Sequence, residues 1–108
     1  MPDNTALTET TYYILLSLYT PLHGYGIMQR TAELSGGRIK LAAGTLYGAL
    51  NAMVDKGWIR LLPGYGRKKE YQLTPKGLEV LTKELRRLRE LVASGDLVLK
   101  EETKCLSE

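Results

Sequence analysis

The chain has 108 residues, 44% of them hydrophobic and 25% charged, as is typical of one small globular domain. This length excludes a separate catalytic domain, and such a chain buries only about 60–68% of its unfolded surface, so an oligomer is one way to cover leftover apolar surface. The net charge of +3 is unevenly placed, because residues 56–76 hold six basic residues and a single acidic one. This bias favours acidic partners.

The sequence predicts a cytoplasmic setting. A single cysteine, Cys105, excludes an intramolecular disulfide, and the first ten residues lack the basic start of a signal peptide. The longest apolar run, residues 12–19, is far shorter than the ~20 residues that cross a bilayer. We therefore expect no membrane segment.

Two helices are predicted in the first third of the chain. The apolar pattern over residues 7–19 indicates a buried helix that ends at Pro21. Residues 23–26 (His-Gly-Tyr-Gly) predict a turn, in which His23 caps the next helix or packs its ring. A short helix over residues 27–34 then ends at the glycine pair 36–37, which suits a left-handed cap.

Residues 38–41 predict no more than a connecting strand before a third helix over residues 42–56, with Gly57 as its cap. One side of this helix is apolar and carries Leu46, Leu50, Met53 and Val54. The opposite side is small or uncharged and carries Gly44, Thr45, Gly48, Asn51 and Ala52. Solvated helix faces are usually rich in Lys and Glu, so this second face suits the close approach of another backbone.

A basic hairpin and a fourth helix complete the chain. Residues 58–62 and 70–73 predict two strands around a glycine-rich tip, which carries Arg67, Lys68 and Lys69. A helix over residues 75–94 begins with Thr74 as its cap and ends where Ser-Gly-Asp breaks the pattern. Residues 95–108 predict a flexible tail.

The fourth helix carries apolar residues at alternating spacings of three and four, the pattern of a coiled-coil seam. They are Leu78, Leu81, Leu85, Leu88 and Val92. This seam packs either on its own domain or on a second copy of the chain. Because residues 83–90 are otherwise mostly charged, we favour a dimer contact.

Catalytic and metal-binding chemistry have little support in the sequence. One His and one Cys provide no paired ligand spacing, so we predict no metal and no cofactor. The Gly-Tyr-Gly triplets at residues 24–26 and 64–66 lack the rest of a phosphate-binding loop and are interpreted as turns. We therefore expect that the protein is not an enzyme.

The order of predicted elements is that of a winged helix-turn-helix, a mainly α fold with a small β-hairpin wing. Residues 1–74 would form a DNA-binding domain, and residues 75–94 a C-terminal dimerisation helix. In this fold the third helix enters the major groove and the wing lies on the phosphate backbone. Thr45 and Asn51 are then placed to read bases. The basic residues available for phosphates are Lys40, Lys56, Arg67, Lys68 and Lys69.

Four short motifs, in this order along the chain, resemble those of a known family: His23-Gly24-Tyr25-Gly26-Ile27; Gly44-Thr45-Leu46-Tyr47 with Ala49-Leu50; Gly57-Trp58-Ile59; and Gly66-Arg67-Lys68-Lys69 with Tyr71-Gln72-Leu73-Thr74 and Gly77. The family is that of the phenolic-acid decarboxylase repressor (PadR), a group of bacterial transcriptional regulators. The resemblance covers residues 7 to about 94. The short C-terminal part resembles the subgroup with one dimerising helix.

The resemblance implies a homodimeric repressor that binds double-stranded DNA at a palindromic operator and is released by a small hydrophobic or aromatic effector. The motif tyrosine corresponds to Tyr47, whose hydroxyl would reach a phosphate unless its ring is a half-buried packing element. The family's usual proline and basic residue are replaced by Gly48 and Asn51, and an Asn can pair with an adenine edge. An effector pocket would use Tyr12, Tyr13 and Tyr19, for which core packing is the alternative.

Another function remains open at this point. Winged helices also serve as protein-interaction adaptors that do not touch nucleic acid, and the basic wing would then meet an acidic protein surface.

Overall fold

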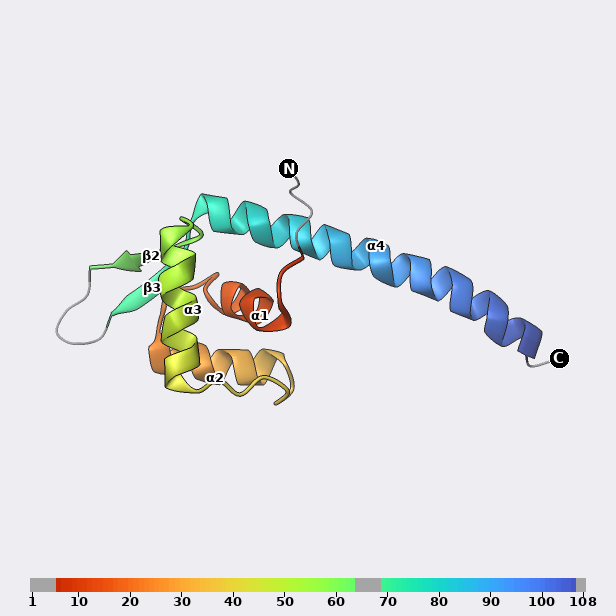
Figure 1. The fold of residues 1–108 in the computed structure, drawn as a ribbon, viewed down its shortest axis with the longest axis horizontal. Coiled ribbons are helices and arrows are strands. Elements are labelled where there is room, and N and C mark those ends of the chain that lie inside the picture. The colour runs from red at the N-terminus through yellow and green to blue at the C-terminus, as the bar shows by residue number, and fades with distance from the viewer. Residues whose placement is uncertain (1–5, 64–68, 107–108) are drawn as a thin grey trace.

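The computed structural model describes residues 6–63 and 69–106, with side chains described up to residue 100. The elements follow in the order α1 (Glu9–Ser17), β1 (Leu22–His23), α2 (Gly24–Leu34), α3 (Ala43–Asp55), β2 (Ile59–Leu62), β3 (Glu70–Leu73) and α4 (Pro75–Leu106) (Figure 1). The predicted winged helix-turn-helix architecture is confirmed, since the fold is mainly helical with a small antiparallel sheet.

The ends of α2 are set by a histidine and two glycines. The backbone N–H of Gly26 donates to Nδ1 of His23 over 3.3 Å, so of the two roles considered for His23, the structure shows the helix cap. The triplet at residues 24–26 is not a turn, as predicted, but the first turn of α2 itself, because this cap lets the helix begin at Gly24. Gly36 and Gly37, at φ of 64° and 88°, form the expected left-handed end.

The sheet has three strands in the order β1-β3-β2, all antiparallel. Tyr71 of β3 lies opposite Leu22 of β1 and Leu61 of β2. The strand predicted at residues 38–41 is wrong, because the N–H of Ile39 donates to the Ser35 hydroxyl over 2.9 Å instead of to a strand. The short β1 was not predicted, since two residues are too few to show an alternating pattern.

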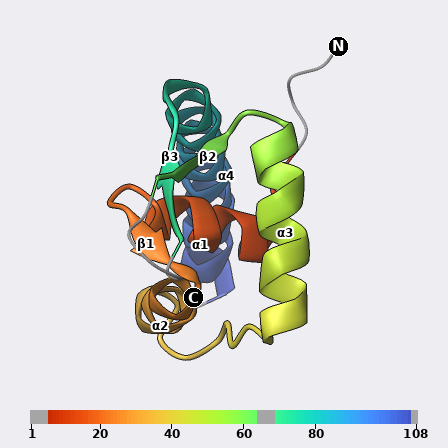
Figure 2. The same ribbon diagram turned by 90° about the vertical axis from the view of Figure 1, so that its left-hand side faces the viewer.

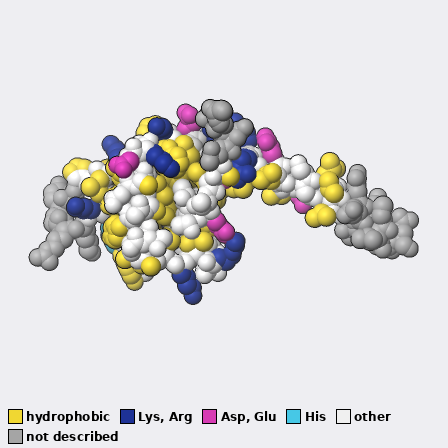
Figure 3. All heavy atoms as spheres, in the orientation of Figure 1, with side chains coloured by type: hydrophobic (Ala, Val, Ile, Leu, Met, Phe, Trp, Pro, Cys, Tyr) yellow, Lys and Arg dark blue, Asp and Glu magenta, His cyan; other side chains and the backbone are white. Residues whose placement is uncertain are grey.

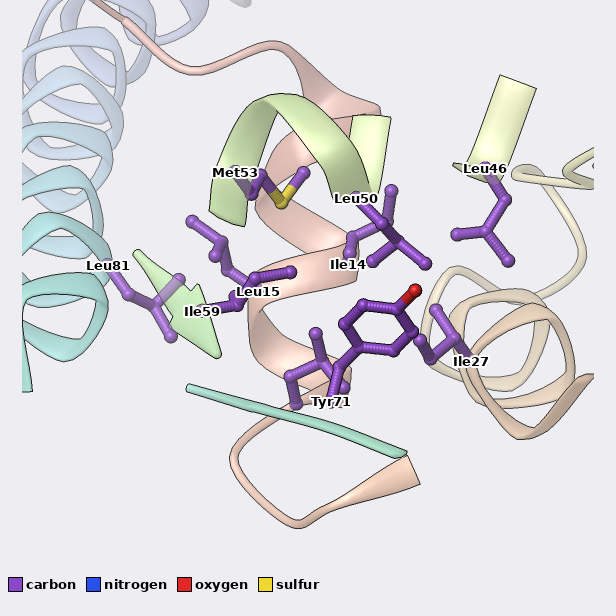
Figure 4. Packing of buried hydrophobic residues seen from close by; sticks show 10 residues of the cluster. Ile14, Leu15, Ile27, Leu46, Leu50, Met53, Ile59, Tyr71 and Leu81 are labelled. Carbon is purple, nitrogen blue, oxygen red and sulfur yellow. The ribbon is translucent and has the colours of Figure 1, made fainter. Parts of the chain in front are cut away.

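The hydrophobic core is built around α1, which lies between α3 and the strands (Figure 2). It joins side chains from every helix and from β2 and β3 (Figure 4). These are Ile14, Leu15, Leu18, Ile27, Leu46, Leu50, Met53, Ile59, Tyr71 and Leu81. Val54, which was predicted on the buried side of α3, is 38% exposed instead. Helix α3 thus packs on the core through one face, and its opposite face points away from the core.

Helix α4 projects far from this body (Figure 1). Its 32 residues extend over about 48 Å at 1.5 Å per residue. The molecule therefore measures 65 × 33 × 21 Å, with a radius of gyration of 17.2 Å, against about 13 Å for a compact chain of this length. Although α4 is long, none of the described helices combines the length and apolar character of a membrane span.

The predicted end of this helix at Ser94 is wrong, because α4 continues through Gly95 to Leu106. The φ of Gly95 is not positive, so this glycine does not act as a cap. A glycine inside a helix costs only about 0.5–1 kcal/mol relative to alanine, which is too little to stop a helix that no proline follows. Residues 95–106, predicted as a flexible tail, are therefore helical.

Candidate nucleic-acid interface

The outward face of α3 is open and uncharged. Every residue predicted for this face is exposed: Gly44, Thr45, Gly48, Asn51 and Ala52. A Cβ atom added to Gly44 or Gly48 would meet no described atom within 4 Å, so packing inside this chain does not require these glycines. The face is therefore free to accept a close contact from outside the molecule.

The beginning of α3 adds to this surface. Its N-cap residue, Ala42, makes no side-chain hydrogen bond to the helix. The first N–H groups of α3 thus have no capping side chain from Ala42, and such groups attract anions. Lys40, just before the helix, is exposed beside them in the sequence.

Tyr47 links the two helices of the helix-turn-helix. A Cβ atom added to Gly24, the first residue of α2, would collide with the Tyr47 hydroxyl and lie 2.9 Å from its Cζ atom. The Tyr47 ring therefore occupies space that only a glycine leaves free. Tyr47 is nevertheless 46% exposed, while its hydroxyl lies against Gly24 at the start of α2. The packing role of Tyr47 accounts for the glycine of the His-Gly-Tyr-Gly motif.

Tyr71 of β3 lies close to this pair. Burial in the core raises the pKa of the Tyr71 hydroxyl, and the neighbouring Tyr47 raises it further. Tyr71 is only 7% exposed. The sheet, α2 and α3 thus come together around Tyr47, which is partly exposed.

The wing contributes basic side chains, although not all of those predicted are described. Lys69 is exposed, whereas Arg67 and Lys68 lie outside the described residues. Lys56 stands over the ring of Trp58, with Nζ 4.6 Å from the ring centroid. Trp58 itself packs against the core.

One further basic residue on the wing was not assigned from the sequence. Arg60 of β2 is exposed, and its Nη2 donates to Oε1 of Gln72 on β3 over 3.1 Å. The only signal in the sequence was its position within the basic stretch, because the cross-strand partner depends on the register. Arg38, in contrast, is paired with Glu9 over 2.6 Å.

The predicted dimerisation residues divide into two groups along α4. Leu81 is 7% exposed and belongs to the core of its own chain, while Leu85 and Leu88 are half-buried. Leu78 and Val92 are 43% and 62% exposed. Leu91 is also exposed, and further exposed apolar side chains lie beyond the predicted helix end: Leu97, Val98 and Leu99. Figure 3 shows hydrophobic side chains along the projecting helix. Because the predicted helix ended at Ser94, the predicted dimerisation residues did not include Leu97, Val98 and Leu99.

The three tyrosines proposed for an effector pocket differ in their surroundings. The rings of Tyr12 and Tyr13 meet edge to face, with centroids 5.7 Å apart, and Tyr12 packs against the core. Tyr19 lies beyond the end of α1 and is 70% exposed. Within the described part of the chain, no three His, Cys, Asp or Glu side chains are grouped as metal ligands.

Solved structures share this architecture. The chain aligns with hsRosR-S1, solved in a complex, at 28% identity and a TM-score of 0.69, over 94% of this chain and 90% of that one. A PadR family transcription regulator from Clostridium difficile R20291 gives a TM-score of 0.73 at 24% identity, over 85% and 99% of the two chains. A PadR-like transcription factor from Bacteroides fragilis gives 0.66 at 25%, over 82% and 87%.

Sequence comparison gives the same result. A 37.1 kDa uncharacterised protein in transposon Tn4556 of Streptomyces fradiae is 44% identical over 64 residues, which are 59% of this chain but only 18% of that longer protein. Residues 14–83, from the middle of α1 into α4, match the transcriptional regulator PadR-like family. With its helix-turn-helix, its three-stranded sheet and its long final helix, the chain belongs to the PadR-like family of transcriptional regulators.

Proposed function

We propose that this regulator is a homodimeric, sequence-specific DNA-binding repressor. The open face of α3 is the observation that carries the proposal. One face of this helix packs on the core and the opposite face carries small, exposed residues, which suits insertion into a major groove. Its membership of a family of transcriptional regulators supports the same function.

Base and phosphate contacts are assigned to different elements. Thr45 and Asn51, exposed on α3, would contact base edges, and Asn51 would pair with an adenine. Phosphates would be bound by the exposed Lys40 and Lys69 and by the hydroxyl of Tyr47, with Arg67 and Lys68 as further predicted contacts.

The exposed apolar part of α4 would pair two protomers. A symmetric dimer presents the same face of both copies, so one strip of apolar residues serves both sides. The two α3 helices would then contact half-sites of a palindrome about 34–36 Å apart. A small hydrophobic or aromatic effector would release the DNA.

The test is a titration of the full chain against random-sequence and promoter-derived DNA duplexes at two salt concentrations, with the protein mass measured in solution. A dimer that binds saturably, more weakly at high salt and more tightly to one promoter, supports the proposal. No binding to either duplex at low salt would contradict it. The adaptor function would then remain, tested by capture of a partner that survives nuclease treatment.

A further inference from the structure

A buried carboxylate fastens α4 to the rest of the domain. Glu84 is 5% exposed, and its Oε1 accepts from Nε of Arg87 over 2.7 Å. Its Oε2 accepts from Nη2 of Arg87 over 2.7 Å and from the backbone N–H of Leu7 over 3.2 Å. A two-pronged arginine–carboxylate pair is strong and directional, and because Glu84 and Arg87 lie one turn apart on α4, it fixes the orientation of the carboxylate on its own helix. The hydrogen bond from Leu7 is the contact of this carboxylate that crosses from α4 to the body. We call Leu7, Glu84 and Arg87 the Glu84 clamp.

The Glu84 clamp lies where α4 leaves the domain. Leu81, one turn before it, is in the core, and Leu88, one turn after it, is half-buried. Every side chain from Arg89 to Ser94 is exposed. Helix α4 thus packs against the body as far as the clamp and then continues alone.

The same clamp reaches toward the beginning of α3. Leu7 precedes Thr8, the cap of α1, and Glu9 binds Arg38 in the segment that leads to α3. Residues 7–9 therefore connect α4 at one end with the approach to α3 at the other. The apolar contacts of α4 tolerate small rotations because the hydrophobic effect is not directional, whereas the hydrogen bond from the Leu7 N–H to a carboxylate that Arg87 holds in place requires one geometry.

We propose that Glu84 is a positioning residue that sets the angle between α4 and its domain, and thereby the half-site spacing that the dimer accepts. The inference rests on the proposed function, in which α4 joins the protomers and α3 reads each half-site. A change of one base pair moves a half-site by about 3.4 Å and turns it by about 35°, so spacing is a sensitive measure of this angle.

The experiment is a selection from a pool of DNA duplexes with a random centre of about 30 base pairs, three turns of the helix. Wild-type protein should enrich paired half-sites at one dominant spacing. Glu84→Gln keeps the side-chain shape but removes the charge through which Arg87 holds the acceptor oxygen in front of the Leu7 N–H. It should enrich the same half-site sequence at three or more adjacent spacings, because base reading by α3 is unchanged while the angle is loosened.

Two variants serve as comparisons. Arg87→Lys keeps the charge but removes the two parallel N–H donors, so it should broaden the spacing less, and it carries the test if Glu84→Gln does not fold. Glu90→Gln makes the same change at an exposed position of α4 and should keep the wild-type spacing. A label at Ala52→Cys in a Cys105→Ser background should also show a broader distance distribution between protomers for Glu84→Gln.

The outcomes separate the two proposals. If wild-type protein enriches no sequence, the proposed function is wrong and this inference falls with it. If wild type enriches one spacing and both clamp variants keep that spacing, only the positioning role is overturned. A folded Glu84→Gln protein that no longer selects the half-site sequence itself would also overturn it, because a positioning residue leaves base recognition intact.

Discussion

At the scale of single residues, the structure explains two kinds of glycine that a motif alone does not distinguish. Gly24 leaves room for the ring of Tyr47, which joins α2 to α3. Gly44 and Gly48 face open space on α3 and serve no packing purpose in the chain itself. The same residue type is therefore structural at one position and available for a partner at the others.

The contact between Gly24 and Tyr47 can be tested by a double-mutant cycle. Gly24→Ala should lower the free energy of unfolding by about 1–3 kcal/mol, because its methyl group collides with the Tyr47 ring. In a Tyr47→Ala background the same change should cost much less. Gly44→Ala is the matched control and should not destabilise the fold, as its Cβ meets no described atom. Equal costs in both backgrounds, by urea unfolding, would show that the two residues are not coupled.

Glu84 predicts an acid dependence of stability. Hydrogen bonds from Arg87 lower the pKa of the Glu84 carboxyl below its ordinary value. The ionised carboxylate therefore stabilises the fold fully above the ordinary glutamate pKa of about 4.3, and this contribution disappears as the pH falls through the lowered pKa. Glu84→Gln should be less stable than wild type at pH 7, and the difference in unfolding free energy should shrink towards pH 3. Glu90→Gln should show no such convergence, and a pH-independent difference for Glu84→Gln would refute this account.

At the scale of elements, α4 is the part of the fold that departs most from expectation. Its first turn is capped and joined to the residue before β2: Thr74 Oγ1 accepts from the Gly77 N–H over 3.0 Å, and the Trp58 carbonyl accepts from the Thr74 N–H over 3.0 Å. Its residues 89–94 and 96–100 are exposed, and a Cβ added to Gly95 between them would meet no described atom within 4 Å. Two glycines of one helix therefore lie in opposite environments.

These glycines form a matched pair of substitutions. Gly77→Ala should lower the unfolding free energy, since its Cβ would collide with the backbone carbonyl of Trp58, which cannot move without disturbing β2. Gly95→Ala should instead raise the helical content of α4, with a gain of up to about 1 kcal/mol in helix propensity, because its Cβ meets nothing described within 4 Å. Circular dichroism during thermal unfolding measures both effects. Destabilisation by Gly95→Ala would indicate that α4 does not continue through this position.

At the scale of the whole molecule, the fold separates the open face of α3, the proposed DNA-binding side, from a projecting helix that carries exposed apolar residues. Among the described residues, ten buried side chains form the core of the body (Figure 4), and the exposed apolar residues of α4 from Leu91 onward lie on the projecting part of the helix, where Figure 3 shows hydrophobic side chains. A helix that carries apolar residues into solvent is stable only weakly by itself, which favours pairing.

The dimer surface is tested by Val92→Glu. This side chain is 62% exposed, so the change should leave the fold of each protomer intact but place a charge in the proposed contact. Since burying a valine contributes about 1.5–3 kcal/mol, the dimer should dissociate at a concentration at least about ten-fold higher. Ser94→Glu, also exposed on α4, is the control. If analytical ultracentrifugation finds the same dimer affinity for wild type and Val92→Glu, the dimer interface does not include Val92.

The proposed DNA-binding side is tested by comparing a wing residue with a residue of α3. Lys69→Ala should weaken binding to all duplexes alike and reduce the slope of log affinity against log salt by about 0.9 for each phosphate that it no longer neutralises. Asn51→Ala should leave this slope unchanged and reduce discrimination at one base position by about 1–3 kcal/mol. A panel of operator variants at several salt concentrations measures both. Uniform weakening across the panel for Asn51→Ala would reassign this residue to a phosphate.

The sequence by itself determined the winged helix-turn-helix order, the caps at His23 and at the glycine pair 36–37, and the two faces of α3. These features depend on neighbours within one or two turns, and local spacing and local hydrogen bonding encode them directly. Only the tertiary structure decided the rest: the two-residue β1, the space at Gly24 for Tyr47, the burial of Glu84 and the continuation of α4 past Gly95. Each of these depends on contacts between distant segments or on a balance of about 1 kcal/mol, which no local pattern specifies.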